Sequence, residues 1–192
     1  MICLTSAISG ISEMELVDSC ISDIAQTGAA AALEKLYSCT KDMIYGYALS
    51  MLKNTQDAED VLHDCYVTVY QSASSYVSRG KPMAWLFTIT RNLCLNRLRS
   101  RQRFTDLPEE DWERYLTANP KTDPDDRILI GYCLRELPDE DREIVLLHIL
   151  SELRFREIAE ITGRPLSTVL SKYQRALKKL RKLLEVEDRD DE

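Results

Sequence analysis

Apolar residues recur along this chain mainly at intervals of three and four positions, the spacing that places them on one face of an α-helix. The pattern is clear in the ranges 29–52, 56–72, 81–103 and 127–184, and a weaker version predicts a short helix at 13–26. Sustained alternation of apolar and polar residues, which would indicate β-strands, is not found. The sequence therefore predicts an all-α fold.

The predicted helix at 56–72 separates an apolar face from an acidic one. Asn54 and Thr55 come just before it, and both are good N-cap residues because their side-chain oxygens accept hydrogen bonds from unpaired backbone N–H groups. Acidic residues in the first turn complement the positive end of the helix dipole. This face is either solvated surface or a docking face for a basic protein partner. Its outer side carries Asp57, Asp60, His63, Asp64 and Gln71.

The predicted helix at 81–103 is apolar and aromatic in its first half and rich in arginine in its second half. A helical projection places polar side chains on one stripe, which begins at Trp85, with apolar residues on both flanks. Asn and Arg can contact base edges, and Trp can stack on an unpaired base or anchor the helix in a core. A buried helix whose arginines only reach solvent is the alternative. The stripe consists of Thr88, Asn92, Asn96, Arg99 and Arg103.

Residues 154–184 predict two helices joined by a tight turn. A short amphipathic helix ends at Gly163, and Pro165 precedes a longer helix that begins near Leu166. The longer helix is apolar on one face and basic on the other, as in a helix-turn-helix whose second helix enters the major groove of DNA. A plain helical hairpin with a solvated basic face is the alternative. The candidate contacts to bases and phosphates are Ser167, Thr168, Ser171, Lys172, Arg175 and Lys178.

Charge is divided unevenly along the 192 residues, whose net charge is −7. Residues 79–103 carry seven Lys and Arg and no acid, and residues 152–184 carry nine Lys and Arg against three acids. Between them, residues 104–126 hold eight acids, two bases and three prolines with little apolar periodicity, which predicts a flexible acidic linker. Two basic blocks separated by a linker suggest two contacts with one polyanion.

The composition gives no support for a catalytic or metal centre. The six cysteines are scattered without a Cys-x-x-Cys pair, and His63 and His148 are the only histidines. This pattern argues against a zinc site and a disulfide framework, and it favours small buried thiols at Cys65 and Cys94. We therefore expect no enzyme activity, no catalytic residue, no bound metal and no cofactor. The chain shows no signal-peptide pattern and no membrane-length apolar run, which predicts a cytoplasmic protein without membrane insertion.

Two sets of residues resemble parts of the sigma-70 family of RNA polymerase sigma factors. The first set resembles domain 2 and comprises DAEDVL at 57–62, Trp85-Leu86, Arg91-Asn92 and Leu98-Arg99. The second set is similar to domain 4 and comprises Leu137-Pro138, Arg142, Glu157-Ile158-Ala159, Thr168-Val169, Arg175-Ala176 and Leu180. Their order, the short linker and the missing middle domain resemble the extracytoplasmic-function (ECF) class of alternative sigma factors.

The resemblance implies two small helical domains and divides the chain accordingly. Residues 1–26 form an N-terminal extension, 27–103 sigma domain 2, 104–126 the linker, 127–184 sigma domain 4 and 185–192 an acidic tail. The linker is expected to pass near the polymerase active centre and the RNA exit path.

The resemblance also implies partners and roles. Domain 2 would dock on the clamp helices of the largest subunit of core RNA polymerase through Asp57, Asp60, His63 and Asp64. It would melt and capture the −10 promoter element with the loop 72–83 and the polar stripe. Domain 4, expected near the polymerase flap, would read the −35 element with the helix that begins near Leu166. An anti-sigma factor is a further expected partner.

Four residues depart from the family pattern. His63 stands where Gln is common, which puts that docking contact in doubt. Arg154 replaces the usual Ser or Thr N-cap, and Glu152 replaces a common Gly, so the first helix of the helix-turn-helix begins less conventionally. Ser167 replaces a frequent Gly, which can change the −35 preference.

Three functions compete on the sequence alone. A promoter-specificity subunit explains both basic blocks and the acidic face. A stand-alone helix-turn-helix regulator explains only the second basic block, and it leaves Trp85 and the adjoining amide stripe without a role. An enzyme lacks a suitable cluster of reactive side chains.

Overall fold

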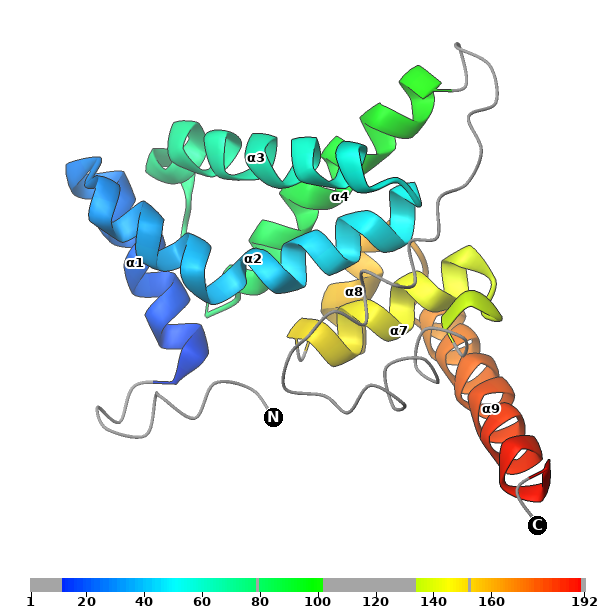
Figure 1. Cartoon of the computed structure of the whole chain (residues 1–192). Helices are drawn as coiled ribbons and strands as arrows, with labels where there is room; N and C mark the ends of the chain where they lie inside the picture. Colours follow the sequence, from blue (N-terminus) through cyan, green and yellow to red (C-terminus); the bar gives the residue numbers. More distant parts are fainter. Residues whose placement is uncertain (1–11, 79, 102–133, 152, 191–192) are drawn as a thin grey trace.

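The computed structural model describes residues 12–78, 80–101, 134–151 and 153–190. In these ranges the chain forms α-helices and one short 3-10 turn, without strands, which confirms the predicted all-α class. Figure 1 shows two groups of helices, α1–α4 and α7–α9. The elements are α1 (Glu13–Thr27), α2 (Ala30–Leu52), α3 (Thr55–Ser72), η2 (Ala73–Ser75), α4 (Pro82–Arg101), α7 (Asp139–Ser151), α8 (Phe155–Thr162) and α9 (Leu166–Asp190).

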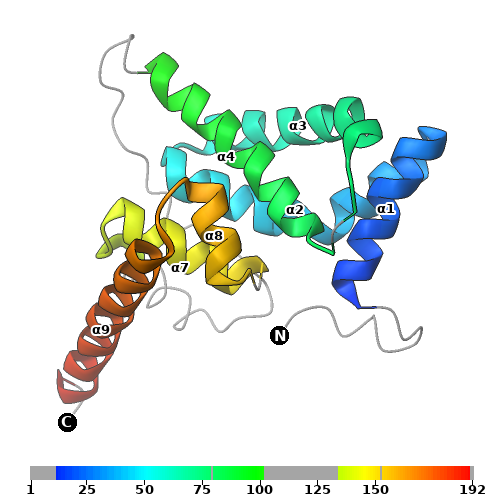
Figure 2. The ribbon, with the colours of Figure 1, turned by 180° about the vertical axis from the view of Figure 1, so that it is seen from behind.

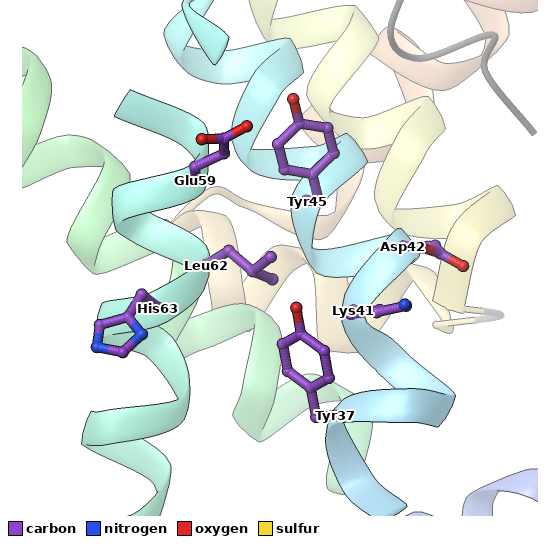
Figure 3. A pocket seen from close by; sticks show the side chains of 7 residues that line it. All are labelled: Tyr37, Lys41, Asp42, Tyr45, Glu59, Leu62 and His63. Atoms are coloured by element: carbon purple, nitrogen blue, oxygen red, sulfur yellow. The ribbon is translucent and has the colours of Figure 1, made fainter. Parts of the chain in front are cut away.

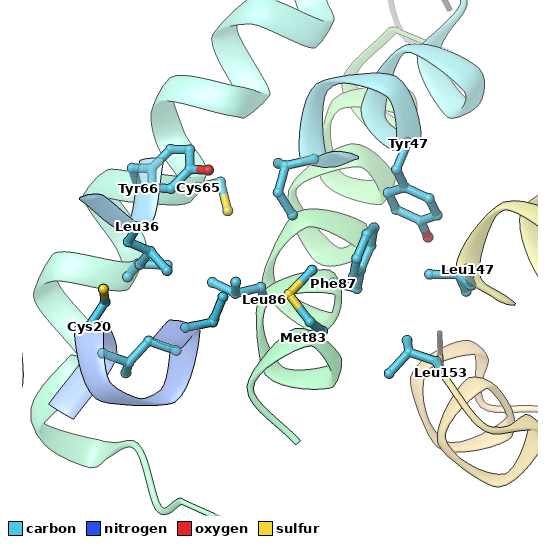
Figure 4. Packing of buried hydrophobic residues seen from close by; sticks show 14 of the residues in the cluster. Cys20, Leu36, Tyr47, Cys65, Tyr66, Met83, Leu86, Phe87, Leu147 and Leu153 are labelled. Carbon is cyan, nitrogen blue, oxygen red and sulfur yellow. The ribbon is translucent and has the colours of Figure 1, made fainter. Parts of the chain in front are cut away.

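The first group is organised around α2, which contacts α1, α3 and α4. Leu36 and Tyr47 of α2 are fully buried, as are Leu86 and Phe87 of α4. The rings of Tyr47 and Phe87 meet edge to face with their centroids 5.2 Å apart, an arrangement that stabilises beyond area burial. Figure 4 shows these side chains converging between the helices.

Helix α1 is defined at both ends by its own sequence. The Ser12 hydroxyl accepts from the Glu15 backbone N–H, and the Glu15 carboxylate accepts from the Ser12 backbone N–H, which is a capping box. The helix ends at Gly28, which adopts a left-handed conformation with φ of 62°. Its inner face buries Cys20 and Ile21, so the weak pattern at 13–26 correctly predicted a helix.

A sharp reversal joins α2 to α3. Lys53 closes α2 in the left-handed region with φ of 50°, and its N–H donates to the Leu49 carbonyl. Asn54 then caps α3 by accepting from the Asp57 backbone N–H at 2.8 Å, which confirms the predicted cap. The predicted helical region 29–52 is a single helix.

Buried thiols lie where α3 and α4 pack together. Cys65 and Cys94 are both fully buried, as the sequence predicted, and the Cys65 Sγ lies 3.4 Å from the Thr90 hydroxyl. Burial raises the pKa of Cys65 to about 11, and burial also raises the pKa of Cys94. Both thiols therefore stay protonated and unreactive at neutral pH.

The helix-turn-helix predicted at 154–184 is present as α8 and α9. Gly163 adopts φ of 66° between them, and the following Arg164 N–H donates to the Ala159 carbonyl. A left-handed position of this kind favours glycine. Arg154 has no acceptor on its side chain, and the N-terminus of α8 is instead closed by Glu157, which accepts from the Arg154 backbone N–H at 2.8 Å.

The two groups of helices pack directly against each other. Leu147 of α7 and Leu153, which precedes α8, belong to the same buried cluster as Tyr47 and Phe87. Helices α7 and α8 contact α4, whereas α9 projects away from the first group in both Figure 1 and Figure 2. The sequence predicted two domains but gave no indication of this shared core.

One predicted domain boundary lies at the end of a helix, and another lies inside a helix. The boundary at residue 27 coincides with the end of α1, which packs into the same core as α2–α4. Helix α9 runs beyond residue 184 to Asp190, into the segment expected to form an acidic tail. The linker at 104–126 lies outside the described residues.

Candidate nucleic-acid interface

The polar stripe of α4 faces outward. Thr88, Asn92, Asn96 and Arg99 are all exposed, while the opposite side of the helix packs into the core. The Thr88 hydroxyl donates to the Ala84 carbonyl at 2.7 Å, so its methyl group remains available for contacts. The side chains of Asn92, Asn96 and Arg99 therefore present donors and acceptors on one surface. Arg103, the last predicted member of the stripe, lies outside the described residues.

Two arginines of the same basic block are used inside the protein. Arg91 is mostly buried, and its Nε donates to Glu143 of α7 at 2.8 Å. Arg97 donates to Asp57 at 2.7 Å and also pairs with Asp60. These acids hold the pKa of Arg97 above its usual range, the hydrogen bond to Asp57 being the largest cause. Part of the positive charge that the sequence assigned to nucleic acid is therefore neutralised by neighbouring helices.

The same ion pairs divide the acidic face of α3. Asp57 and Asp60 are paired with Arg97, while His63 and Asp64 are exposed. His63 lies at the edge of a surface hollow of about 430 Å³ between α2 and α3, shown in Figure 3. The hollow combines aromatic, aliphatic and charged side chains, which suits a protein partner. Its lining residues are Tyr37, Lys41, Asp42, Tyr45, Glu59, Leu62 and His63.

The segment between η2 and α4 is held by contacts that the sequence analysis missed. The Tyr76 hydroxyl donates to Asp18 of α1 at 2.5 Å, and the Ser78 hydroxyl donates to the same carboxylate at 2.7 Å. The Tyr76 ring packs on Trp85 with centroids 4.9 Å apart. Trp85 thus helps anchor α4, as the sequence suggested, and no pattern around Asp18 signalled its role.

The N-terminal half of α9 presents most of the predicted −35 residues. Ser167, Ser171, Arg175 and Lys178 are exposed, while Thr168 and Lys172 are half-buried. Figures 1 and 2 show α9 extending freely beyond the helices that carry it. A second hollow of about 390 Å³ beside this helix is lined by four cations together with Asp141 and the apolar residues Leu137, Pro138 and Ala176. These cations are Arg175, Lys178, Lys179 and Lys182.

Lys172 differs from the other cations of α9 because it has carboxylate partners on α7. Its Nζ lies 2.5 Å from Glu140 and 3.3 Å from Asp141. Glu140 also accepts from Arg164 at 2.7 Å. The hydrogen bond from Lys172 is the largest cause of a lowered pKa at Glu140. This network joins the turn of the helix-turn-helix to α7.

No cluster of metal-ligating side chains occurs among the residues that the structure describes. Within the same ranges, no helix is both long and apolar enough to cross a membrane.

Two family models match this chain. The model described as Sigma-70 region 2 matches residues 36–104, which contain most of α2, all of α3 and the polar stripe of α4. The model described as Sigma-70, region 4 matches residues 127–180, which contain α7, α8 and the exposed half of α9. Helix α1 precedes both matches.

Curated relatives and solved structures agree with these matches. The chain is 29% identical over 167 residues to the ECF RNA polymerase sigma factor SigK of Mycobacterium tuberculosis (strain ATCC 25618 / H37Rv), covering 81% of this chain and 87% of the relative. It is 26% identical over 179 residues to SigK of Mycolicibacterium vanbaalenii, covering 88% and 90%.

Among solved structures, the fold is similar to that of the sigma factor RpoE in complex with the anti-sigma factor NepR from Bartonella quintana. The TM-score is 0.63 at 22% identity, covering 80% of this chain and 96% of that one. It is also similar to CnrH in complex with the cytosolic domain of CnrY, with a TM-score of 0.58 at 21% identity, covering 91% and 97%.

Proposed function

The chain belongs to the sigma-70 family, and on that premise we propose that it is an ECF-type sigma factor. In this role it binds core RNA polymerase, recognises the −35 and −10 elements of a promoter and assists promoter melting. One observation carries the proposal: a single chain presents an amide and guanidinium stripe on α4 and a basic face on α9. A sigma factor is a transcription initiation factor, and its own part is recognition rather than a chemical step.

The stripe on α4 is suited to an opened promoter strand. Asn92, Asn96 and Arg99 offer hydrogen-bonding groups that unpaired bases can meet on several edges. We assign to them, with Thr88, Arg103 and the loop at 72–83, the capture of the −10 element.

Helix α9 is suited to duplex DNA. Ser167, Thr168 and Ser171 lie in its first two turns, where a helix-turn-helix approaches base edges in the major groove. Arg175 and Lys178 follow one turn later and supply phosphate contacts. We assign the −35 element to this helix, including Lys172.

Helix α3 supplies the polymerase-docking face. Of the four residues assigned to it, Asp60, His63 and Asp64 are exposed and available to a partner. Asp57 is mostly buried, and its ion pair with Arg97 holds α3 against α4. The partner surfaces are the clamp helices of the largest polymerase subunit and, for the second helical group, the flap.

An anti-sigma factor is a further proposed partner, since the similar sigma factor RpoE was solved in complex with the anti-sigma factor NepR. A protein that works with polymerase and promoter DNA acts in the cytoplasm, which is our proposed location.

The domain limits given above, at 27–103 and 127–184, remain part of this proposal.

Transcription with core polymerase tests the proposal. Core enzyme plus this protein should yield specific transcripts from a promoter library, whereas core enzyme alone should not. The protein alone, with its net charge of −7, should bind duplex DNA weakly. Tight sequence-specific duplex binding without polymerase, combined with no specific transcript, would instead identify a stand-alone regulator.

A further inference from the structure

Helix α1 lies outside the two regions that the family models match, yet it contacts the segment that leads into α4. Four apolar residues of α1 are buried in the core of the first group. Helix α1 is therefore a fixed support rather than a loose extension. The buried residues are Val17, Cys20, Ile21 and Ile24.

Asp18 connects this support to the segment between η2 and α4. Its Oδ1 accepts from the Tyr76 hydroxyl at 2.5 Å, and its Oδ2 accepts from the Ser78 hydroxyl at 2.7 Å. Burial and the bond to Asp18 raise the pKa of Tyr76, so the phenol remains a donor at physiological pH. Hydrogen bonds to a charged acceptor are stronger than neutral ones.

Val77 lies between the two hydroxyl residues that Asp18 holds. Its neighbours point toward α1, and its own side chain is 64% exposed, the largest exposure among the large apolar residues of the described ranges. The Tyr76 ring is fixed from the other side by Trp85, at 4.9 Å between centroids. The Asp18 carboxylate and the Trp85 indole thus hold the residues on either side of the exposed Val77.

We propose that Asp18 is a positioning residue for promoter opening, which holds Tyr76 and Ser78 so that Val77 meets an unpaired base of the −10 element. The inference rests on the proposed function, because the segment before α4 can contact an opened DNA strand only if the protein binds promoters. Asp18 itself does not touch DNA. Its hydrogen bonds restrict the segment before binding. The segment therefore loses less conformational entropy when it contacts the DNA strand.

The test compares Asp18→Ala with Asp23→Ala in the complete protein bound to core polymerase. Asp23 is an exposed aspartate on the same helix, so the two variants lose the same charge. We expect Asp18→Ala to slow promoter opening roughly five- to tenfold, as loss of a charged hydrogen-bond network would. Opening is measured by the fluorescence of 2-aminopurine placed in the −10 element, and Asp23→Ala should match the wild-type protein.

Four further measurements separate positioning from general stability. Affinity for core polymerase and the melting temperature should change little in Asp18→Ala, while the ranking of the four bases at the unpaired −10 positions should flatten. Tyr76→Phe combined with Ser78→Ala should slow opening, and adding Asp18→Ala to that pair should cause almost no further loss.

The results for Asp18→Ala distinguish failure of this inference from failure of the proposed function. Unchanged opening in Asp18→Ala, or a loss that only parallels a lower melting temperature or weaker polymerase binding, would overturn the inference and leave the sigma-factor proposal standing. If the wild-type holoenzyme opens no promoter, both are overturned.

Discussion

Arginines that look alike in the sequence serve different purposes in this protein. Arg97 and Arg99 are two positions apart in the same basic block, but Arg97 pairs with Asp57 and Asp60 of α3. Arg99 is exposed on the polar stripe, and among the described residues its hydrogen bond is a long contact of 3.5 Å to Asn96. The distinction depends on what lies opposite each side chain, which helical periodicity does not show.

A pair of substitutions separates these two roles. Arg97→Ala should lower the free energy of unfolding by about 1 kcal/mol, because the ion pairs of Arg97 with Asp57 and Asp60 are lost. Arg99→Ala should leave that free energy nearly unchanged and reduce open-complex formation with core polymerase. Urea unfolding of each protein and fluorescence of a labelled −10 strand measure the two effects. Equal loss of stability in both variants would contradict the assignment.

The cations of α9 permit a similar comparison. Arg175 and Lys178 are exposed, whereas the Lys179 Nζ donates to the Glu136 carbonyl and lies 3.8 Å from the Glu136 carboxylate. Arg175→Ala and Lys178→Ala should each reduce the slope of log affinity against log salt by roughly 0.9, since each removes one phosphate contact. Promoter binding by the holoenzyme over a range of salt concentrations gives the slope. Lys179→Ala is the control and should change it less.

At the scale of elements, α3 carries two faces with separate functions. Its apolar side packs against α2 and α4, and its acidic side is partly tied to α4 by the Arg97 ion pairs. Asp57 is mostly covered by its contact with Arg97, whereas Asp60, His63 and Asp64 remain exposed. The ion pairs therefore remove one acid, rather than the whole row, from the surface proposed for docking.

Asp64→Arg tests this docking surface. The change should weaken binding to core polymerase about tenfold, because like charges then face each other across the interface. Glu34→Arg places the same charge change on an exposed position of α2 and should have little effect. Competition with a labelled reference sigma factor for core enzyme measures both affinities. Undiminished assembly of the Asp64→Arg holoenzyme would count against α3 as the docking helix.

At the scale of the whole molecule, one polar network lies inside the contact between the two helical groups. Glu143 of α7 accepts from Arg91 at 2.8 Å and from the Tyr47 hydroxyl at 2.9 Å. Their side chains are almost entirely shielded from water, and burial raises the pKa of Tyr47. Lys81 and Glu157 form a second ion pair across the contact at 3.4 Å, with Lys81 44% exposed.

Loss of the Glu143–Arg91 pair should disturb the packing of the two helical groups more than loss of the Lys81–Glu157 pair. Glu143→Ala leaves Arg91 buried without its carboxylate, and should cost on the order of 3 kcal/mol of stability and enlarge the radius of gyration. Lys81→Ala removes a pair whose lysine is partly exposed, and the buried Glu157 keeps its bond to the Arg154 N–H, so the change should cost less than about 1 kcal/mol and leave the radius unchanged. Thermal unfolding and small-angle X-ray scattering measure these effects. An unchanged radius in Glu143→Ala would show that the Glu143 network is not needed to hold the groups together.

The sequence by itself determined the helices, because amphipathic spacing, caps and breakers act over a few residues. Asn54 and Gly163 mark helix ends through local hydrogen bonding and backbone conformation. The helix-turn-helix and the exposed stripe of α4 were likewise predicted from spacing alone. The resemblance to the sigma-70 family rested on the same local motifs.

Only the tertiary structure decided which charged and polar groups meet. Asp18 binds residues about sixty positions away, and Glu143 binds Arg91 from another helical group. Such pairs leave no periodic trace in the sequence, since their partners are brought together by the packing of whole helices. For the same reason the sequence could not separate Arg97 from Arg99, nor show that α1–α4 and α7–α8 share a buried cluster.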